Sequence, residues 1–139
     1  GTCYTGFVET FFACQRGSDV NFVLKSTVPV GFTRRTRARF SLPNLVHSPE
    51  FLTARTAVAD AKNPVRLVVG YPEGIANAPP TLFNLYRECW PFIFPLVMLS
   101  DESEMVKLMQ NAFSAVKVSF FNEAWTMAVS IRSSPSSAA

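Results

Sequence analysis

Two polar residues, Thr27 and Glu50, stand shortly after apolar segments of the chain that are typical of strands. If both segments belong to one parallel sheet, right-handed crossovers place the two residues at the same edge. Ligands bind at this edge in open parallel sheets, because loops and helix N-termini bring unpaired donors together there. Thr27 and Glu50 are therefore candidates for a ligand site.

Lys107 and Asn111 are four residues apart in a long helical pattern, so their side chains share one helix face. Glu104 and Ser114 extend this polar stripe, and one row of side chains could face one ligand. Spacing alone favours another interpretation, a solvated stripe with a weak ion pair between Glu104 and Lys107.

The elements that position these residues follow from hydrophobic patterning. Short apolar, largely β-branched segments predict strands, and an irregular segment containing Pro95 predicts a fourth, less regular one. The strands are residues 20–24, 44–47, 65–69 and 92–98, and the helices are residues 5–16, 32–40, 81–90 and 101–132. Gly17 ends the first helix, while Asp101 and Glu104 form a capping-box-like start of the last. This alternation predicts an α/β fold with a parallel sheet and right-handed crossovers.

Composition narrows the classes of function. The chain has 139 residues, 48% apolar and 17% charged, which suits one hydrophobic core. No apolar run approaches the roughly 20 residues that span a bilayer, and no signal-peptide pattern opens the chain, so we expect a cytoplasmic protein without membrane contact.

Metal and disulfide chemistry have little support. Cys3, Cys14 and Cys89 are odd in number and lack CxxC spacing, which predicts buried or incidental thiols. His47 is the single histidine and is expected to be a packing residue.

Four arginines lie close together in the predicted helix at residues 32–40, so nucleic-acid binding must be considered. Aromatic residues that could stack on bases are not interleaved with them, so the arginines are expected to face water. Nucleic-acid binding is thus the weakest alternative. The arginines are Arg34, Arg35, Arg37 and Arg39.

Several loop and helix motifs together resemble the UDP-glucose/GDP-mannose dehydrogenase family. Their order and approximate spacing agree from about residue 3 to residue 131. The motifs are Ser-Thr-Val-Pro-Val-Gly at 26–31, Ser-Pro-Glu-Phe-Leu at 48–52, Asp60 with Asn-Pro-Val-Arg-Leu-Val-Val-Gly at 63–70, Glu-Met-Val-Lys-Leu-Met-Gln-Asn-Ala-Phe at 104–113, and Asn-Glu at 122–123.

The resemblance implies a fold and a domain organisation. Residues 1–99 would form a partial Rossmann-like parallel sheet of about three to four strands with flanking helices, the second half of an NAD-binding domain. Residues 100–132 would form the long central dimerisation helix of the family. Residues 133–139 have the composition of a disordered tail.

The resemblance also implies an activity. Members of the family use NAD to oxidise the C6 hydroxyl of a nucleotide sugar twice, and the second oxidation passes through a thioester on a cysteine. Thr27 would hold a catalytic water near the nicotinamide. Glu50 would act as acid/base, notably in thioester hydrolysis.

The remaining site residues are carried over in the same way. Phe51 and Leu52 would approach the nucleotide sugar through their backbone. Lys107 would stabilise developing oxyanion charge, and Asn111 would help to hold the water or oxygen by hydrogen bonding. The resemblance therefore implies that Thr27, Glu50, Lys107 and Asn111 converge at one cleft.

The chain departs from the family pattern at important points. It contains no GxGxxG turn to cradle the NAD pyrophosphate, and none of its cysteines matches the family's nucleophile motif. Ala54 stands where the family usually has a carboxylate. NAD binding is therefore doubtful, and the sequence predicts a truncated relative that is inactive alone.

An alternative function is a non-catalytic binding or structural protein. Met109, Phe113, Val116 and Phe120 form an apolar stripe on the last helix. Such a stripe predicts a homodimer or higher oligomer through residues Asp101 to Arg132, because exposing it would be costly.

Overall fold

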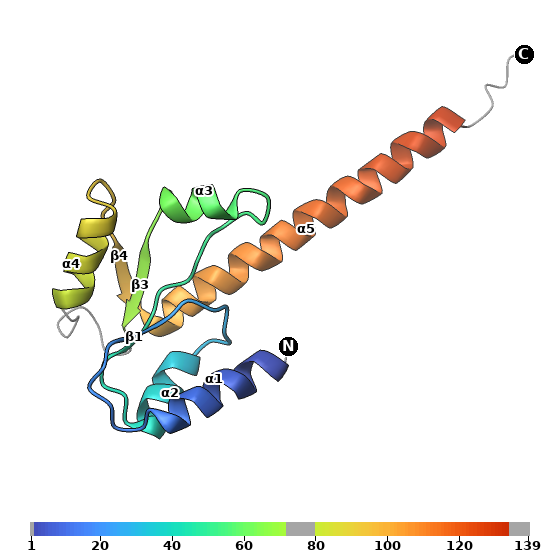
Figure 1. Ribbon diagram of the computed structural model, residues 1–139. Coiled ribbons are helices and arrows are strands. Elements are labelled where there is room, and N and C mark those ends of the chain that lie inside the picture. Colours follow the sequence, from blue (N-terminus) through green and yellow to red (C-terminus); the bar gives the residue numbers. More distant parts are fainter. Residues whose placement is uncertain (1, 72–79, 134–139) are drawn as a thin grey trace, which may run out of the picture. The chain divides into compact units, whose positions relative to one another are not determined.

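The computed structural model describes residues 2–71 and 80–133 (Figure 1). The chain divides into two compact units, Gly1–Leu108 and Met109–Ala139. Helix α5 (Ser100–Ser133) begins in the first unit and continues into the second. Most of the predicted tail, residues 134–139, lies outside the described residues.

The first unit contains a four-stranded sheet, with β1 (Phe22–Leu24), β2 (Leu45–His47), β3 (Val68–Tyr71) and β4 (Leu96–Leu99) in this order. Strands β1 and β2 pair in parallel, as do β3 and β4. The predicted fold class, an α/β sheet with flanking helices and a long C-terminal helix, is confirmed, and the sheet is mostly parallel.

One strand pair runs against the predicted parallel direction. Strands β2 and β3 are antiparallel, with His47 opposite Gly70. Parallel neighbours need a crossover, usually through a helix packed on the sheet, whereas antiparallel neighbours do not. The segment between β2 and β3 carries only the short helix α3 (Ala57–Lys62), which has no buried residue.

The helices match the predictions to different degrees. Helix α2 (Phe32–Phe40) has the predicted bounds, while α1 (Thr2–Cys14) and α4 (Pro80–Cys89) are shifted by a few residues. Helix α3 was not predicted, because a helix without a buried face leaves no apolar stripe in the sequence. Strand β3 starts later than predicted because Val65 is 98% exposed.

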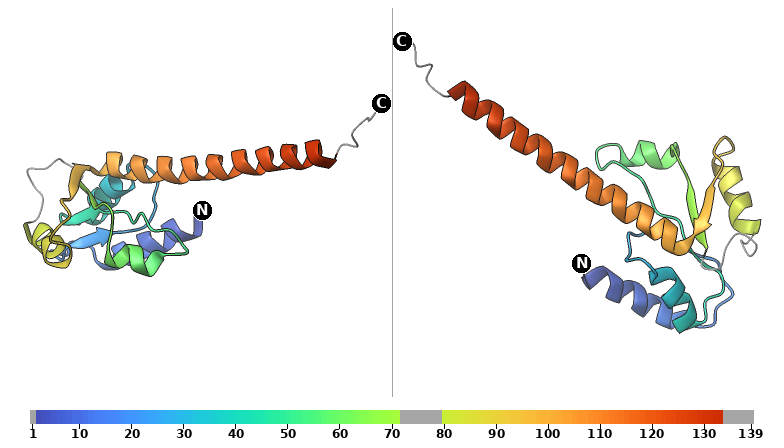
Figure 2. Two further views of the ribbon diagram at one scale, coloured as in Figure 1. Left: turned by 90° about the horizontal axis from the view of Figure 1, so that it is seen from above. Right: turned by 180° about the vertical axis from the view of Figure 1, so that it is seen from behind.

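Two hydrophobic clusters lie on opposite sides of β2. Leu45 belongs to the cluster that includes Phe12 of α1 and Phe40 of α2. Val46 belongs to the cluster that includes Val69 of β3 and residues of α4. Successive side chains of a strand point to opposite faces, so this short strand separates the two clusters. Figure 2 shows α1 and α2 together on one side, apart from α4 and β4.

The start of α5 packs directly against β3 at Gly70. A Cβ atom on Gly70 would lie 2.6 Å from the Cβ of Ser103 and 2.9 Å from the Cα of Ser100. Only a residue without a side chain permits this approach.

The predicted capping box of α5 is wrong. Glu102 caps the helix by accepting a hydrogen bond of 2.8 Å from the amide of Leu99. Asp101 pairs with Arg34 at 3.1 Å, and Glu104 bonds to the start of α2. The tertiary partners of these carboxylates override the local pattern.

The second unit is helical up to Ser133, and the side chains described there are exposed except for the half-buried Gln110. They include large apolar residues such as Phe113, Phe120 and Trp125, which are 64%, 65% and 72% exposed. Among the described helices, none is both long and apolar enough to cross a membrane.

Candidate functional site

The loop that follows β2 begins with a firmly held Ser48. Its amide donates a hydrogen bond of 2.9 Å to the carbonyl oxygen of Leu24, at the end of β1. Its hydroxyl accepts a hydrogen bond of 2.9 Å from Tyr86 of α4. Ser48 is fully buried, whereas Glu50, two residues later, is exposed. The first residue of the loop is therefore held in place, and the Glu50 carboxylate two residues later is accessible to solvent.

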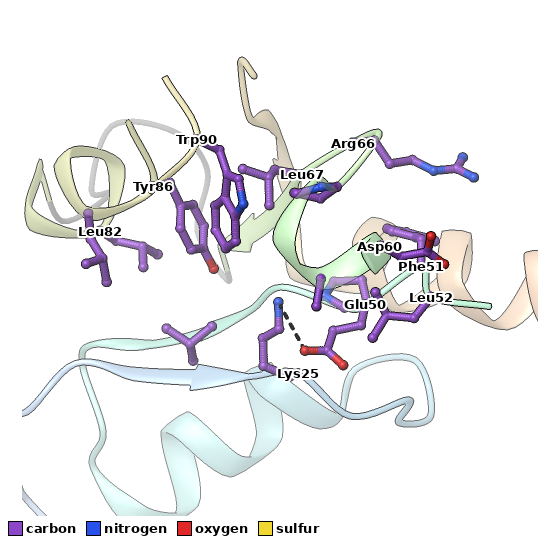
Figure 3. Close-up of a pocket in the computed structure, with 15 residues that line it drawn as sticks. Lys25, Glu50, Phe51, Leu52, Asp60, Arg66, Leu67, Leu82, Tyr86 and Trp90 are labelled. Atoms are coloured by element: carbon purple, nitrogen blue, oxygen red, sulfur yellow. Dashed lines mark ion pairs between the residues drawn. The ribbon is translucent and has the colours of Figure 1, made fainter. Parts of the chain in front are cut away.

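Lys25, at the end of β1, faces Glu50. Its Nζ lies 3.8 Å from Oε1 of Glu50, and the two side chains are 38% and 48% exposed. Partial burial lowers the pKa of Lys25, and the charge of Glu50 opposes this effect. The two loops that follow β1 and β2 thus approach each other at this ion pair (Figure 3).

Lys107 lies close to the same loop. Its Nζ is 5.3 Å from the centroid of the Phe51 ring, and the guanidinium of Arg66 is 4.6 Å from this centroid. Partial burial lowers the pKa of Lys107, while the charge of Glu50 raises it and that of Arg66 lowers it further. The structure therefore brings Glu50, Phe51 and Lys107 together.

The interpretation of a solvated Glu104–Lys107 pair is wrong. Glu104 is fully buried, and its carboxylate accepts hydrogen bonds from the amides of Gly31 and Thr33 and from the Thr33 hydroxyl. Lys107, three residues later, faces the Phe51 loop instead.

The other two predicted catalytic residues, Thr27 and Asn111, are both exposed. Thr27 lies in the loop between β1 and α2. Asn111 belongs to the second unit, so its meeting with Glu50 stays a prediction. Cys14 and Cys89 are exposed and free, so of the predicted buried or incidental thiols these two are not buried. No group of three or more Asp, Glu, His or Cys side chains among the described residues could hold a metal.

A cavity of about 350 Å³ adjoins Glu50 (Figure 3). Phe51 and Leu52, both half-buried, line one part of it, and Leu82 and Trp90 line another. Asp60 also lines the cavity, but its carboxylate already accepts hydrogen bonds from the amide of Thr53 and the hydroxyl of Thr56.

Comparison with known proteins gives a consistent result. The UDP-glucose 6-dehydrogenase of Campylobacter jejuni is 37% identical over 108 residues, which cover 76% of this chain and 27% of the relative. The enzyme of the same name from Streptococcus pneumoniae is 31% identical over 123 residues, which cover 79% of this chain and 29% of the relative. No protein-family model matches the chain.

Solved structures agree with these relatives. A UDP-glucose dehydrogenase from Pyrobaculum islandicum has a TM-score of 0.66 and 31% identity, covering 87% of this chain and 29% of that one. A GDP-mannose dehydrogenase from Pseudomonas aeruginosa has a TM-score of 0.65 and 25% identity, covering 85% of this chain and 30% of that one. The chain is a relative of the UDP-glucose/GDP-mannose dehydrogenases. It spans less than a third of the length of each of these four proteins.

The described residues provide no cradle for the pyrophosphate of the NAD that membership of this dehydrogenase family implies. In dinucleotide-binding folds the pyrophosphate rests on a glycine-rich turn at a helix N-terminus. The sequence has no GxGxxG turn. The N-terminus of α2, which follows β1, is already filled by the carboxylate of Glu104.

Sequence reasoning missed two buried polar contacts of this dehydrogenase relative. One is the carboxylate of Glu104 on α5, which accepts hydrogen bonds from the start of α2. The other is His47, whose Nδ1 lies 2.6 Å from Oγ of Ser103 and whose Nε2 lies 3.2 Å from the carbonyl oxygen of Ser26. His47 is buried as expected, but it also links three elements. Burial lowers its pKa, so the neutral ring is favoured, with Nε2 as donor to Ser26 and Nδ1 as acceptor from Ser103.

Proposed function

We propose that this chain supplies the acid/base and oxyanion-stabilising part of a nucleotide-sugar dehydrogenase site. The position of Lys107 over the Phe51 ring, where the charge of Glu50 acts on it, supports this proposal. The identity to UDP-glucose 6-dehydrogenases supports a nucleotide sugar as the ligand. A cytoplasmic location is part of the same proposal.

Each residue has a role that suits its surroundings. Glu50 is exposed, so its carboxylate can reach a water or substrate proton and act as acid/base. Lys107 is half-buried, and a partly desolvated cation acts more strongly on a developing oxyanion than one in water. The backbone of Phe51 and Leu52 would contact the nucleotide sugar.

Thr27 and Asn111 complete the proposed site by holding a water or oxygen. Both are exposed, so both can receive a ligand. Their approach to Glu50 is part of the proposal.

We further propose that the 139 residues alone do not oxidise a nucleotide sugar, since they have no GxGxxG turn and no matching cysteine. The expected result with UDP-glucose or GDP-mannose and NAD is no NADH above a blank without protein. Steady formation of NADH would contradict this part of the proposal.

A chimera tests the assigned roles. This chain would replace the aligned segment of the Campylobacter jejuni enzyme, which supplies the remaining parts. If the chimera forms NADH from UDP-glucose, we expect Glu50→Gln and Lys107→Met each to lower kcat by about 100-fold or more, because each removes a group that acts in the transition state.

Glu88→Gln, an exposed carboxylate change on α4, is the matched control and should leave kcat unchanged. Full activity of both the Glu50 and the Lys107 variants would reject the assigned roles.

A second candidate function, a non-catalytic protein that dimerises through the long helix, has its own support. Met109, Phe113, Val116 and Phe120 are 62–65% exposed. We propose that a second copy covers them, since contiguous apolar surface of this kind marks interaction sites.

A further inference from the structure

A single buried imidazole connects the loop that carries Thr27 to the start of α5. Nε2 of His47 lies 3.2 Å from the carbonyl oxygen of Ser26, and Nδ1 lies 2.6 Å from Oγ of Ser103. The side chains of His47 and Ser103 are both 0% exposed. Bulk water therefore does not compete for the contact between them, and the ring joins two segments that are far apart in the sequence.

The sheet also holds Ser103 at this point. His47 of β2 and Gly70 of β3 are opposite each other in the antiparallel pair. A Cβ atom on Gly70 would lie 2.6 Å from Cβ of Ser103, so Ser103 packs against the backbone of one member of this pair and bonds to the ring of the other. Helix α5 therefore has little freedom to slide along the sheet at this residue.

Thr27 depends on its neighbours for its position, because its own side chain is exposed. After it, Val28 is buried in the hydrophobic core, and the amide of Gly31 donates to the carboxylate of Glu104 on α5. Before it, the carbonyl group of Ser26 is held by the imidazole. The backbone that carries Thr27 is thus fixed on both sides, and α5 takes part in both.

Lys107 lies on the same helix, four residues after Ser103. This spacing is about one helical turn, so a shift of α5 at Ser103 would move Lys107 with it. Nζ of Lys107 is 5.3 Å from the centroid of the Phe51 ring, so such a shift would also change this contact. The imidazole therefore helps to set the distance from the Thr27 backbone to Lys107.

We propose that His47 and Ser103 are positioning residues of the proposed site. The neutral ring donates through Nε2–H to Ser26 and accepts through Nδ1 from the Ser103 hydroxyl, and it thereby fixes the Thr27 backbone relative to Lys107. Both positioning residues are fully buried, so they act through Thr27 and Lys107 and not on the substrate. This inference rests on the proposed function, which gives Thr27 and Lys107 their roles.

Nuclear magnetic resonance tests the contacts in the full chain. The chain contains a single histidine, so the ring signals of His47 are unambiguous. Above about pH 6.5, ¹⁵N spectra should show the Nε2–H tautomer. The amide of Thr27 belongs to the same peptide group as the Ser26 carbonyl, so its ¹H–¹⁵N signal should shift when Ser103→Ala removes the hydroxyl. Ser100→Ala changes a second buried serine of α5 and should leave this signal in place.

Kinetics of the chimera test whether these positions matter to the reaction. Ser103→Ala and His47→Gln should each lower kcat by about tenfold and leave KM within about twofold, because misplaced groups slow the reaction more than they weaken binding. The amide nitrogen of glutamine can take the place of Nε2, but glutamine then leaves the hydroxyl of Ser103 without its acceptor. The double variant should therefore be no slower than His47→Gln alone. Ser100→Ala should leave kcat unchanged.

Three outcomes would overturn the proposal. The first is a ring in the Nδ1–H tautomer, and the second is a Thr27 signal that responds equally to Ser103→Ala and Ser100→Ala. The third is an active chimera whose kcat per folded molecule is unaffected by changes at His47 and Ser103. The tautomer is measured in the unchanged chain, so the test holds even if a variant fails to fold. An inactive chimera would count against the proposed function alone, and the spectra would still decide the contacts.

Discussion

The Oε1 atom of Glu104 lies 2.7 Å from the amide nitrogen of Thr33 and 2.6 Å from its hydroxyl oxygen, across 71 residues of sequence. Its other oxygen accepts the amide of Gly31, the N-cap of α2, which has no side chain of its own to cap the helix. A carboxylate at this position also interacts favourably with the helix dipole. Helix α5 therefore caps α2, and the loop that carries Thr27 leads directly into this contact.

The first prediction concerns this cap. Glu104→Gln places an amide group where two backbone donors need an acceptor, so we expect the free energy of unfolding to fall by about 2–3 kcal/mol. Chemical denaturation measures it. Glu102→Gln, which alters the exposed cap of α5, should cost less than about 1 kcal/mol. Equal costs for the two variants would contradict the importance of the buried cap.

The second prediction concerns Gly70. Gly70→Ala should lower the free energy of unfolding by about 1–3 kcal/mol, because the new methyl group meets the backbone and Ser103 of α5. Gly17→Ala is the matched control. Gly17 has a φ of +72° but nothing within 4 Å of an added Cβ, so its cost is backbone strain of about 1 kcal/mol. A smaller loss at Gly70 than at Gly17 would show that α5 moves away easily.

The third prediction is a pH dependence from His47. Burial lowers the pKa of His47 in the folded state, whereas in the unfolded chain it stays near about 6.5. The unfolded state therefore binds more protons between the two pKa values, and stability rises with pH in this window. The contribution is fully present above about pH 6.5 and is lost as pH falls toward the folded pKa.

Denaturant midpoints measured from about pH 7.5 to pH 5.5 should show this loss, and His47→Gln should flatten the profile over the same range. Glu104 and Lys25 also act on the ring, in opposite directions. An unchanged slope in the variant would assign the pH dependence to other groups.

The fourth prediction concerns self-association. Sedimentation should show a dimer or higher oligomer whose population rises with concentration, since large exposed apolar side chains follow the helix after Met109. Phe113→Asp combined with Phe120→Asp should give a monomer, while Lys117→Gln should not. A monomer at every concentration, unaffected by these changes, would remove the support for the second candidate function.

The sequence predicted elements best where local patterns and burial agree. Helix α2 has its predicted bounds because Phe32 and Phe40 are both buried and Gly31 precedes the first turn with positive φ. The start of β3 was misplaced because Val65 has the residue type of a strand but is exposed. Residue type gives strand propensity, but it does not give burial.

Contacts between distant elements could not be predicted from periodicity. A helical pattern places Glu104 and Lys107 on one face, yet one side chain is buried under α2 and the other lies over Phe51. Periodicity gives relative directions within one helix and contains nothing about its neighbours. The resemblance to a family supplied the pairing of Lys107 with the Glu50 loop as an expectation.

Strand β2 has only three residues, and all three are buried. Leu45 and Val46 enter opposite clusters, and His47 bonds to Ser103. Inserting or deleting one residue here would turn every following side chain to the other face and would shift the pairing with β1 and β3. The exposed loop around Thr53 can change its length without this exchange. Among related chains, length variation should therefore be confined to such loops and be excluded from β2.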